Sequence, residues 1–169
     1  MNTSANYKEL LKHIRCFVFD IDGVMTDGSL LIEENGTMLR RMNIKDGYAL
    51  QLAARKGYYI FVISGSTPEG VKIRLSRLGI DEVYLGVENK LAKLENLMMK
   101  YRVGFDQMVY MGDDMPDLEV MKKCLLRTCP ADAVHQVQEV CQFISAHPGG
   151  NGCVRDIIEQ VLTLQNDWE

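Results

Sequence analysis

Two aspartates stand directly after a short apolar run near the start of the chain. The run is Cys16–Phe19, the carboxylates are Asp20 and Asp22, and Gly23 follows them. Such a run is typical of a strand buried on both faces of a sheet, and a glycine lets the backbone turn sharply where the strand ends. Two carboxylates held so close repel each other unless a cation or a shared proton intervenes. Taken alone, the stretch fits either a charged site or a plain acidic turn.

Polar side chains also follow later apolar runs of the chain. We expect further strands over 58–63, 83–85, 108–111 and 125–128, with a short edge strand over 142–144. The polar residues that come after three of these strands are Ser64, Lys90, Asp113 and Asp114. Each of them fits a cap or a solvated turn when it is considered singly. Because the carboxyl ends of parallel strands meet at one edge of a sheet, their common position predicts a site there.

Helical patterns separate these runs. We expect helices over 7–13, 47–56, 68–78, from Asn89 onward, from Pro116 to about 123, over 131–140 and over 154–164, with Asp46 as the N-cap of the second. Strands that alternate with helices predict an α/β fold, with a doubly wound, Rossmann-like parallel sheet and helices on both faces. Residues 1–169 are expected to form a single domain.

Residues 28–43 interrupt the passage from the first strand to the helix that should follow it. Two short β-compatible pieces flank Glu34-Asn35-Gly36, and Asn-Gly is a strong hairpin signal. We therefore expect a small β-hairpin insertion that covers the carboxylates, pairs with another chain, or does both. No large cap domain is expected. The run Gly149–Gly152 breaks the chain before the last helix, in a C-terminal tail over about 147–169.

Composition excludes several classes of protein. The 169 residues are 47% hydrophobic and 25% charged, as in an ordinary globular domain. A net charge of -4 and a pI near 5.4 make nucleic acid and anionic membranes poor partners. No stretch approaches the roughly 18 apolar residues of a membrane helix, and the first residues show no signal-peptide pattern. The five scattered cysteines are expected to be reduced and mostly buried, in a cytoplasmic protein.

The oxygen-rich sheet edge suits a hard cation. Carboxylates are the ligands that Mg²⁺ prefers, and no Cys or His joins them, which disfavours zinc and copper. The residues predicted to hold Mg²⁺ are Asp20, Asp22, Asp113 and Asp114, the last directly or through water.

A cation beside a lysine and a hydroxyl describes a phosphoryl-transfer site. Without the metal and Lys90, a carboxylate could not approach a phosphate dianion, because both are negative. With them, Asp20 attacks phosphorus in line and forms an aspartyl phosphate. Asp22 protonates the leaving alkoxide and later deprotonates the hydrolytic water. Ser64 donates a hydrogen bond to a phosphoryl oxygen and completes the predicted catalytic set.

These residues resemble, in order, the four motifs of the haloacid dehalogenase superfamily. The motifs are Asp20-Ile21-Asp22-Gly23-Val24-Met25-Thr26, Ser64-Gly65, Lys90, and Gly112-Asp113-Asp114-Met115-Pro116-Asp117. In that superfamily the first aspartate is the nucleophile and the aspartate two residues later is the acid/base. The second aspartate marks phosphatases and phosphomutases and argues against dehalogenation.

From about Ile14 to Leu162, the chain looks like the capless branch that hydrolyses 3-deoxy-D-manno-octulosonate 8-phosphate. The stretches that carry this likeness are Asp22–Gly28, the hairpin, Asn43–Tyr48 and Gly149–Asp156. The branch consists of Mg²⁺-dependent homotetramers whose hairpins associate around the symmetry axis. A neighbouring subunit completes each active site there, including with its glycine-rich tail.

The likeness to this branch also implies a substrate-binding set. The set is Asp22, Asn43, Ile44, Lys45, Asp46, Gly47, Gly65, Ser66, Arg74 and Lys90, with residues 43–47 at the sugar end. Many members of the branch carry arginine where this chain has Ser66, Gln51 and Lys45. Only arginine offers a bidentate fork to a carboxylate. The departures leave phosphatase chemistry intact and keep 2-keto-3-deoxynononate 9-phosphate, the nine-carbon analogue, as the alternative substrate.

Two other classes of function stay open. A phosphoacceptor receiver module also carries acids at the edge of a doubly wound sheet, and a non-catalytic relative could serve as an assembly subunit. A receiver would place its acceptor aspartate on a later strand, whereas the second strand here ends in Ser64. The intact catalytic set speaks against the assembly subunit. The remaining expectations are that Arg40 and Arg41 lie on a solvated side of the hairpin, that Tyr48 is core, and that His13, His135 and His147 have no role in the site.

Overall fold

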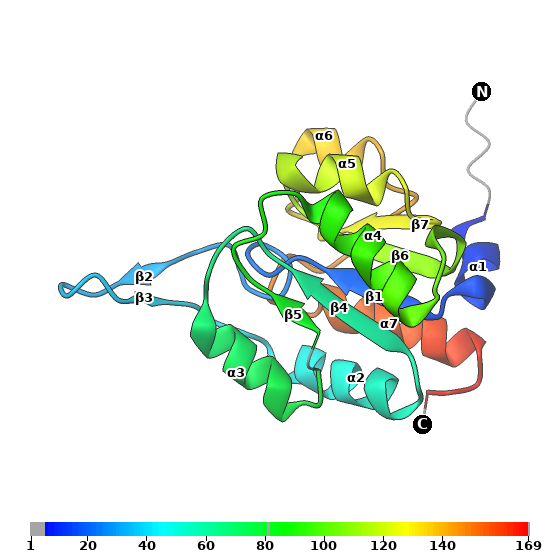
Figure 1. Ribbon diagram of the computed structural model, residues 1–169, viewed down its shortest axis with the longest axis horizontal. Coiled ribbons are helices and arrows are strands. Elements are labelled where there is room, and N and C mark those ends of the chain that lie inside the picture. Colours follow the sequence, from blue (N-terminus) through cyan, green and yellow to red (C-terminus); the bar gives the residue numbers. More distant parts are fainter. Residues whose placement is uncertain (1–5, 81, 169) are drawn as a thin grey trace.

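The computed structural model describes residues 6–80 and 82–168 (Figure 1). Residues 1–5, 81 and 169, which the predicted domain includes, lie outside the described residues. The sheet has six parallel strands in the order β5-β4-β1-β6-β7-β8. Their bounds are β1 Cys16–Phe19, β4 Tyr59–Ile63, β5 Val83–Tyr84, β6 Met108–Met111, β7 Leu126–Cys129 and β8 Phe143–Ile144. The strand order reverses between β1 and β6, so the predicted doubly wound parallel sheet is confirmed.

Helices cover both faces of the sheet. Phe17 and Phe19 of β1 pack into one core with α2 (Ile44–Arg55), α3 (Glu69–Arg77) and α7 (Cys153–Leu164). Cys16 and Val18 of the same strand pack into a second core on the other face. The helices of that core are α4 (Lys90–Tyr101), α5 (Leu118–Met121) and α6 (His135–Gln138). All four side chains of β1 are buried, which explains its unbroken apolar sequence.

Two of the predicted helices are shorter than expected. Residues 7–13 form α1 (Tyr7–Leu10) and a 3₁₀ turn, Leu11–His13, and 131–140 is helical only over α6. In the second case, tertiary hydrogen bonds replace helical ones: Ala131 N–H donates to His147 O and Val134 N–H donates to Asp113 O. The helix predicted after Pro116 likewise begins as a 3₁₀ turn, Met115–Asp117, and continues as α5. A further 3₁₀ turn, Phe105–Gln107, precedes β6.

The start of α2 corrects two expectations. Asn43, and not Asp46, is the N-cap, since its side chain accepts a hydrogen bond from Lys45 N–H at 2.8 Å. Asp46 lies within the first turn and accepts a hydrogen bond from Arg155 N–H of α7 at 2.8 Å. Tyr48 is 45% exposed, so its assignment to the core is wrong. Its ring lies nearly perpendicular to that of Trp168, with the two ring centroids 6.1 Å apart.

The predicted hairpin insertion is confirmed. It consists of β2 (Leu31–Ile32) and β3 (Met38–Leu39), which pair antiparallel and project from the body of the molecule (Figure 1). Its apolar side chains are largely exposed. Within the described part of the chain, this ribbon is the whole insertion and no cap domain stands over the sheet edge. None of the described helices has the length and apolar character needed to cross a membrane. All five cysteines are free thiols, and four of them are buried.

Candidate active site

The loop after β1 folds tightly around one carbonyl group. Asp20 continues the strand, with its N–H donating to Met111 O of β6 at 3.2 Å. The carbonyl of Ile21 then accepts hydrogen bonds from the N–H groups of Val24, Met25 and Thr26 at 2.9–3.2 Å. The chain therefore turns back within a few residues of the strand end and keeps both aspartates at the sheet edge.

Gly23 is required in this loop for two reasons. Its φ of +82° lies in the left-handed region, which side chains rarely adopt. A Cβ atom at this position would also lie 2.0 Å from Oδ2 of Asp113, at the end of β6. The loop therefore touches the carboxylate of a different strand, and only glycine permits the contact.

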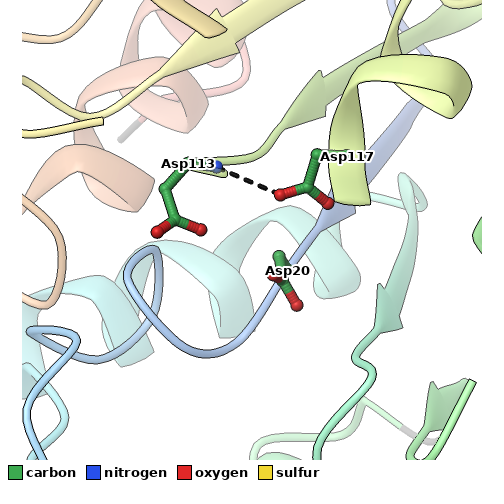
Figure 2. Close-up of side chains that lie close together, drawn as sticks. All are labelled: Asp20, Asp113 and Asp117. Carbon is green, nitrogen blue, oxygen red and sulfur yellow. Dashed lines mark hydrogen bonds between the residues drawn. The ribbon is translucent and has the colours of Figure 1, made fainter. Parts of the chain in front are cut away.

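Three carboxylates converge at this edge (Figure 2). Asp20, Asp113 and Asp117 each have an oxygen within 4.8 Å of the others. Lys90, at the start of α4 and only 6% exposed, pairs with Asp20 Oδ2 at 2.9 Å and with Asp117 Oδ1 at 2.7 Å. Strands β1 and β6 and the N-terminus of α4 thus meet where the parallel sheet predicts a site.

Asp117 is held from several sides. Besides Lys90, its Oδ1 accepts a hydrogen bond from Tyr110 Oη at 2.7 Å, and its Oδ2 accepts one from Asp113 N–H at 3.1 Å. Asp113 differs, because its buried Oδ1 has no hydrogen-bond partner among the described residues. A buried carboxylate oxygen without a partner is costly unless a proton or a cation satisfies it.

Burial and mutual repulsion raise the pKa of two of these carboxyl groups. Burial, with a further contribution from Asp117, raises the pKa of Asp20 to about 6, although Lys90 acts in the opposite direction. Burial and the nearby Asp20 raise the pKa of Asp113 to about 7. Burial disfavours the charge on Lys90, but the carboxylates of Asp117 and Asp20 outweigh it and raise the pKa of the ammonium. One ammonium cannot neutralise three carboxylates, so the site fits a hard divalent cation bound through oxygen.

The carboxylate of Asp22 is paired with Arg40 and does not belong to the group of three carboxylates. Arg40, at the foot of the hairpin, donates from Nε to Oδ1 at 2.6 Å and from Nη2 to Oδ2 at 3.1 Å. Burial acts in the opposite direction, but the hydrogen bonds of Arg40 lower the pKa of Asp22. Asp114 is exposed and accepts a hydrogen bond from Met115 N–H at the start of the 3₁₀ turn. Asp22 and Asp114 lie outside the group of three carboxylates, and their roles as metal ligands stay predictions.

The predicted phosphate-binding and substrate residues divide between two cavities. Ser64 is buried, and its Oγ lies 3.0 Å from Ser66 Oγ. Ser66, Arg40 and Arg74 line a cavity of about 750 Å³ between the hairpin and α3. Lys45 lines a different cavity, of about 630 Å³. Its other lining residues include Asn43, His147, Asn151 and Arg155.

The remaining residues at the predicted sugar end lie around the first turn of α2. Ile44 is 80% exposed and Asp46 is buried. Gly47 packs closely against Arg74, because a Cβ there would lie 3.1 Å from Nη2. Gly65 lies beside Val87 O. The structure therefore brings Gly47, Ser66 and Arg74 to one region and places Lys45 apart from them.

Three contributors to the site were not predicted. Asp117 had a signal, since it is the last residue of the fourth motif, Gly112–Asp117, although no role was assigned to it, and it stands three residues after Asp114, the spacing of a capping box. Tyr110 had none, because a tyrosine within an apolar strand is normally core. Arg40 was assigned to a solvated side of the hairpin, but its side chain is only 11% exposed and pairs with Asp22.

A scan against models of protein families finds no match. The Escherichia coli (strain K12) protein named 3-deoxy-D-manno-octulosonate 8-phosphate phosphatase KdsC is 32% identical over 162 residues, 96% of this chain and 86% of that protein. The phosphatase of the same name from Moraxella catarrhalis, solved with magnesium, phosphate and KDO, has a TM-score of 0.91 at 30% identity and covers 95% of this chain and 92% of its own. A Legionella pneumophila protein assigned to the HAD superfamily (subfamily III A) of hydrolases has a TM-score of 0.92 at 32% identity, over 95% of this chain and 88% of its own.

The fold and the site define a hydrolase of the haloacid dehalogenase (HAD) superfamily. The sheet order, the acidic edge and the absence of a cap domain from residues 6–80 and 82–168 agree with that class. Within it, the chain belongs to the family of 3-deoxy-D-manno-octulosonate 8-phosphate phosphatases named KdsC, and the resemblance predicted from the motifs is confirmed.

Proposed function

We propose that this chain is a Mg²⁺-dependent phosphatase that hydrolyses 3-deoxy-D-manno-octulosonate 8-phosphate to the free sugar acid and phosphate. The observation that carries the proposal is the pairing of buried Lys90 with both Asp20 and Asp117, beside the unpartnered buried oxygen of Asp113. The relatives support the substrate, since the Moraxella protein holds magnesium, phosphate and KDO together.

Asp20 is the proposed nucleophile. Its Oδ1 accepts a hydrogen bond from Ile21 N–H at 2.7 Å and its Oδ2 is paired with Lys90, so the side chain is fixed in one orientation. One carboxylate oxygen bonds to phosphorus as the bond to the sugar oxygen breaks, which gives an aspartyl phosphate. Water then attacks the same phosphorus and regenerates the carboxylate. Asp20 and Asp113 would hold Mg²⁺, which would supply the charge neutralisation that lets a carboxylate approach a phosphate dianion.

Asp22 is the proposed general acid and base. It must carry a proton to protonate the departing sugar oxygen, yet its pairing with Arg40 favours the ionised form. Arg40 also lines the 750 Å³ cavity, so an anionic group of the substrate that enters this cavity competes for the guanidinium and frees Asp22. Ser64, buried directly after β4, is the proposed donor of a hydrogen bond to a phosphoryl oxygen.

The test is phosphate release, with Mg²⁺ and with EDTA, from the eight-carbon and nine-carbon ulosonate phosphates and ordinary sugar phosphates. Metal-dependent preference for the eight-carbon acid is expected. Preference for the nine-carbon acid would keep the mechanism and make Ser66, Gln51 and Lys45 the residues that select the substrate. If no compound releases phosphate, the chain would be a non-catalytic assembly subunit. If a long-lived phosphoaspartate forms as well, it would be a phosphoacceptor receiver module.

We infer that the active form is a homotetramer in the cytoplasm, whose product feeds lipopolysaccharide synthesis. The exposed apolar side chains of the hairpin support the assembly. These side chains are Leu30, Leu31, Ile32, Met38 and Leu39, each 45–67% exposed.

A further inference from the structure

The segment of residues 149–152 is a sequence motif that the proposed mechanism leaves without a role. It packs against the backbone of residues 23–27, the loop that directly follows the two aspartates after β1. The N–H of Gly150 donates to Val24 O at 2.9 Å, and the thiol of Cys153 donates to the same oxygen at 3.3 Å. The segment is therefore more than a break before α7.

The contact between the two backbones leaves no room for a side chain. A Cβ on Gly149 would lie 2.0 Å from Gly23 O and 2.9 Å from Thr26 O. A Cβ on Gly150 would lie 2.5 Å from the backbone nitrogen of Asp27, and its φ of +61° is already in the left-handed region. Two adjacent glycines are thus needed for this contact.

The loop that these glycines support also touches the metal-binding edge. Gly23 lies so close to Asp113 that an added Cβ would overlap its carboxylate, at 2.0 Å from Oδ2. The glycines themselves are anchored, because Gly149 N–H donates to Oδ1 of Asp132 at 2.9 Å, in the turn after β7. A continuous set of contacts therefore runs from the side chain of Asp132 through the backbones of Gly149 and Gly23 to the carboxylate of Asp113.

We propose that Gly149 and Gly150 are positioning residues that set the distance between the loop of residues 23–27 and Asp113, and through it the spacing of the oxygens that bind Mg²⁺. This role requires no contact of the two glycines with the metal or the substrate. The identity of the cation rests on the proposed function.

Gly150→Ala tests the proposal, with Gly57→Ala as its matched control. Gly57 also has a left-handed φ, +88°, but an added Cβ there meets nothing within 4 Å. Both variants carry the strain of a left-handed φ, and Gly150→Ala adds an overlap with the backbone of Thr26 and Asp27, so its melting temperature should fall further than that of Gly57→Ala. Only Gly150→Ala should weaken Mg²⁺ binding, measured by isothermal titration calorimetry, by roughly tenfold, as substitutions that disturb the support of a metal ligand do. It should lower kcat more than it raises KM. Equal Mg²⁺ affinity in the two variants would overturn the proposal.

Asp132→Ala and Asp132→Asn keep the proposal testable if Gly150→Ala does not fold. Asp132 is exposed, and asparagine retains an acceptor for Gly149 N–H whereas alanine does not. Weaker Mg²⁺ binding in Asp132→Ala and near-normal binding in Asp132→Asn are expected. Equal Mg²⁺ binding by Asp132→Ala and the parent would overturn the proposal. A parent chain that binds no Mg²⁺ would instead overturn the proposed function, and the positioning role with it.

Discussion

At the scale of single residues, the site is shaped by an excess of negative charge. Asp20, Asp113 and Asp117 bring oxygens within 4.8 Å of one another, and Lys90 is paired with two of them. Repulsion at this distance favours either protons or a divalent cation. The roles of the three carboxylates follow from their partners. Asp117 is paired with Lys90 and accepts from Asp113 N–H, Asp20 is paired with Lys90 and is the proposed nucleophile, and Oδ1 of Asp113 has no partner among the described residues.

Asp20→Asn should abolish turnover and preserve the fold, because the change is nearly isosteric and removes the nucleophilic oxygen. A fall in kcat of at least about 10⁴-fold is expected. Asp106→Asn is the control, since it makes the same change at an exposed position before β6, at the opposite edge of the sheet. Phosphate release and circular dichroism are the measurements. A fully active Asp20→Asn would remove the proposed nucleophile.

The carboxyl pKa values give a pH dependence of stability. The pKa values of Asp20, about 6, and Asp113, about 7, lie above the ordinary value of 3.8. Between pH 4 and 7 the folded state then binds more protons than the unfolded state, so the free energy of unfolding of the Mg²⁺-free protein should fall as pH rises. Mg²⁺ should restore the stability most at pH 8.

Asp113→Asn separates this effect from a general pH response. In EDTA the variant should melt at least about 3 °C higher than the parent at pH 8, and this difference should shrink steadily as the pH is lowered toward 4. Calorimetric scans with EDTA and with Mg²⁺ check both expectations. A parent whose melting temperature in EDTA rises between pH 5 and pH 8 would contradict them.

Arg40→Gln tests the pairing with Asp22. If Arg40 receives an anionic group of the substrate, its loss should raise KM by about tenfold, which corresponds to 1.4 kcal/mol. Stability should change little, because partly exposed ion pairs contribute about 1 kcal/mol or less. Arg41→Gln is the neighbouring control, since Arg41 is 80% exposed and pairs with Asp27. Equal KM values for the two variants would remove the proposed role of Arg40.

At the scale of elements, the pattern of strands and helices could be predicted because both faces of the sheet are buried. The unbroken apolar runs and the helical periodicity are local features of the sequence. They were enough to predict the strands whose carboxyl ends are followed by Asp20, Ser64 and Asp113. What could not be predicted depends on contacts between distant segments. Asn43 and Asp46 are both good N-caps, and the choice between them was decided by Arg155 of α7, 109 residues beyond Asp46. The burial of Arg40 likewise depends on where the hairpin folds.

Asp46→Ala should reveal how α2 and α7 are joined. Asp46 accepts a hydrogen bond from Arg155 N–H in the first turn of α7, whose own N-cap, Gly152, provides no side chain. Loss of such a cap costs about 1 kcal/mol, so the melting temperature should fall by about 2–4 °C. Asp46→Asn retains an oxygen acceptor and should melt close to the parent. If Asp46 binds substrate as predicted, Asp46→Asn would also raise KM, which phosphate release measures separately.

At the scale of the whole molecule, the described residues form no cap over the proposed active edge, and the hairpin projects from the body of a single chain with its apolar side chains exposed. Strands of two residues each are too short to be stable in water on their own. The exposed apolar side chains of this ribbon form the kind of surface that another copy of the chain would bury. The predicted tetramer would therefore stabilise the hairpin and, at the same time, enclose the 750 Å³ cavity that β3 helps to line.

Replacing Leu31 and Ile32, which are 67% and 64% exposed, with serine tests this assembly. Since neither side chain contributes to the core of one chain, the fold should survive, and light scattering should show a mass smaller than that of the tetramer. KM should rise, because the cavity is no longer closed by a neighbour. Met99→Ser, at an 80% exposed position on α4, makes a comparable change away from the hairpin and should leave both mass and KM unaltered. An unchanged mass in the double variant would place the interface elsewhere, and the hairpin would then need another explanation for its apolar surface.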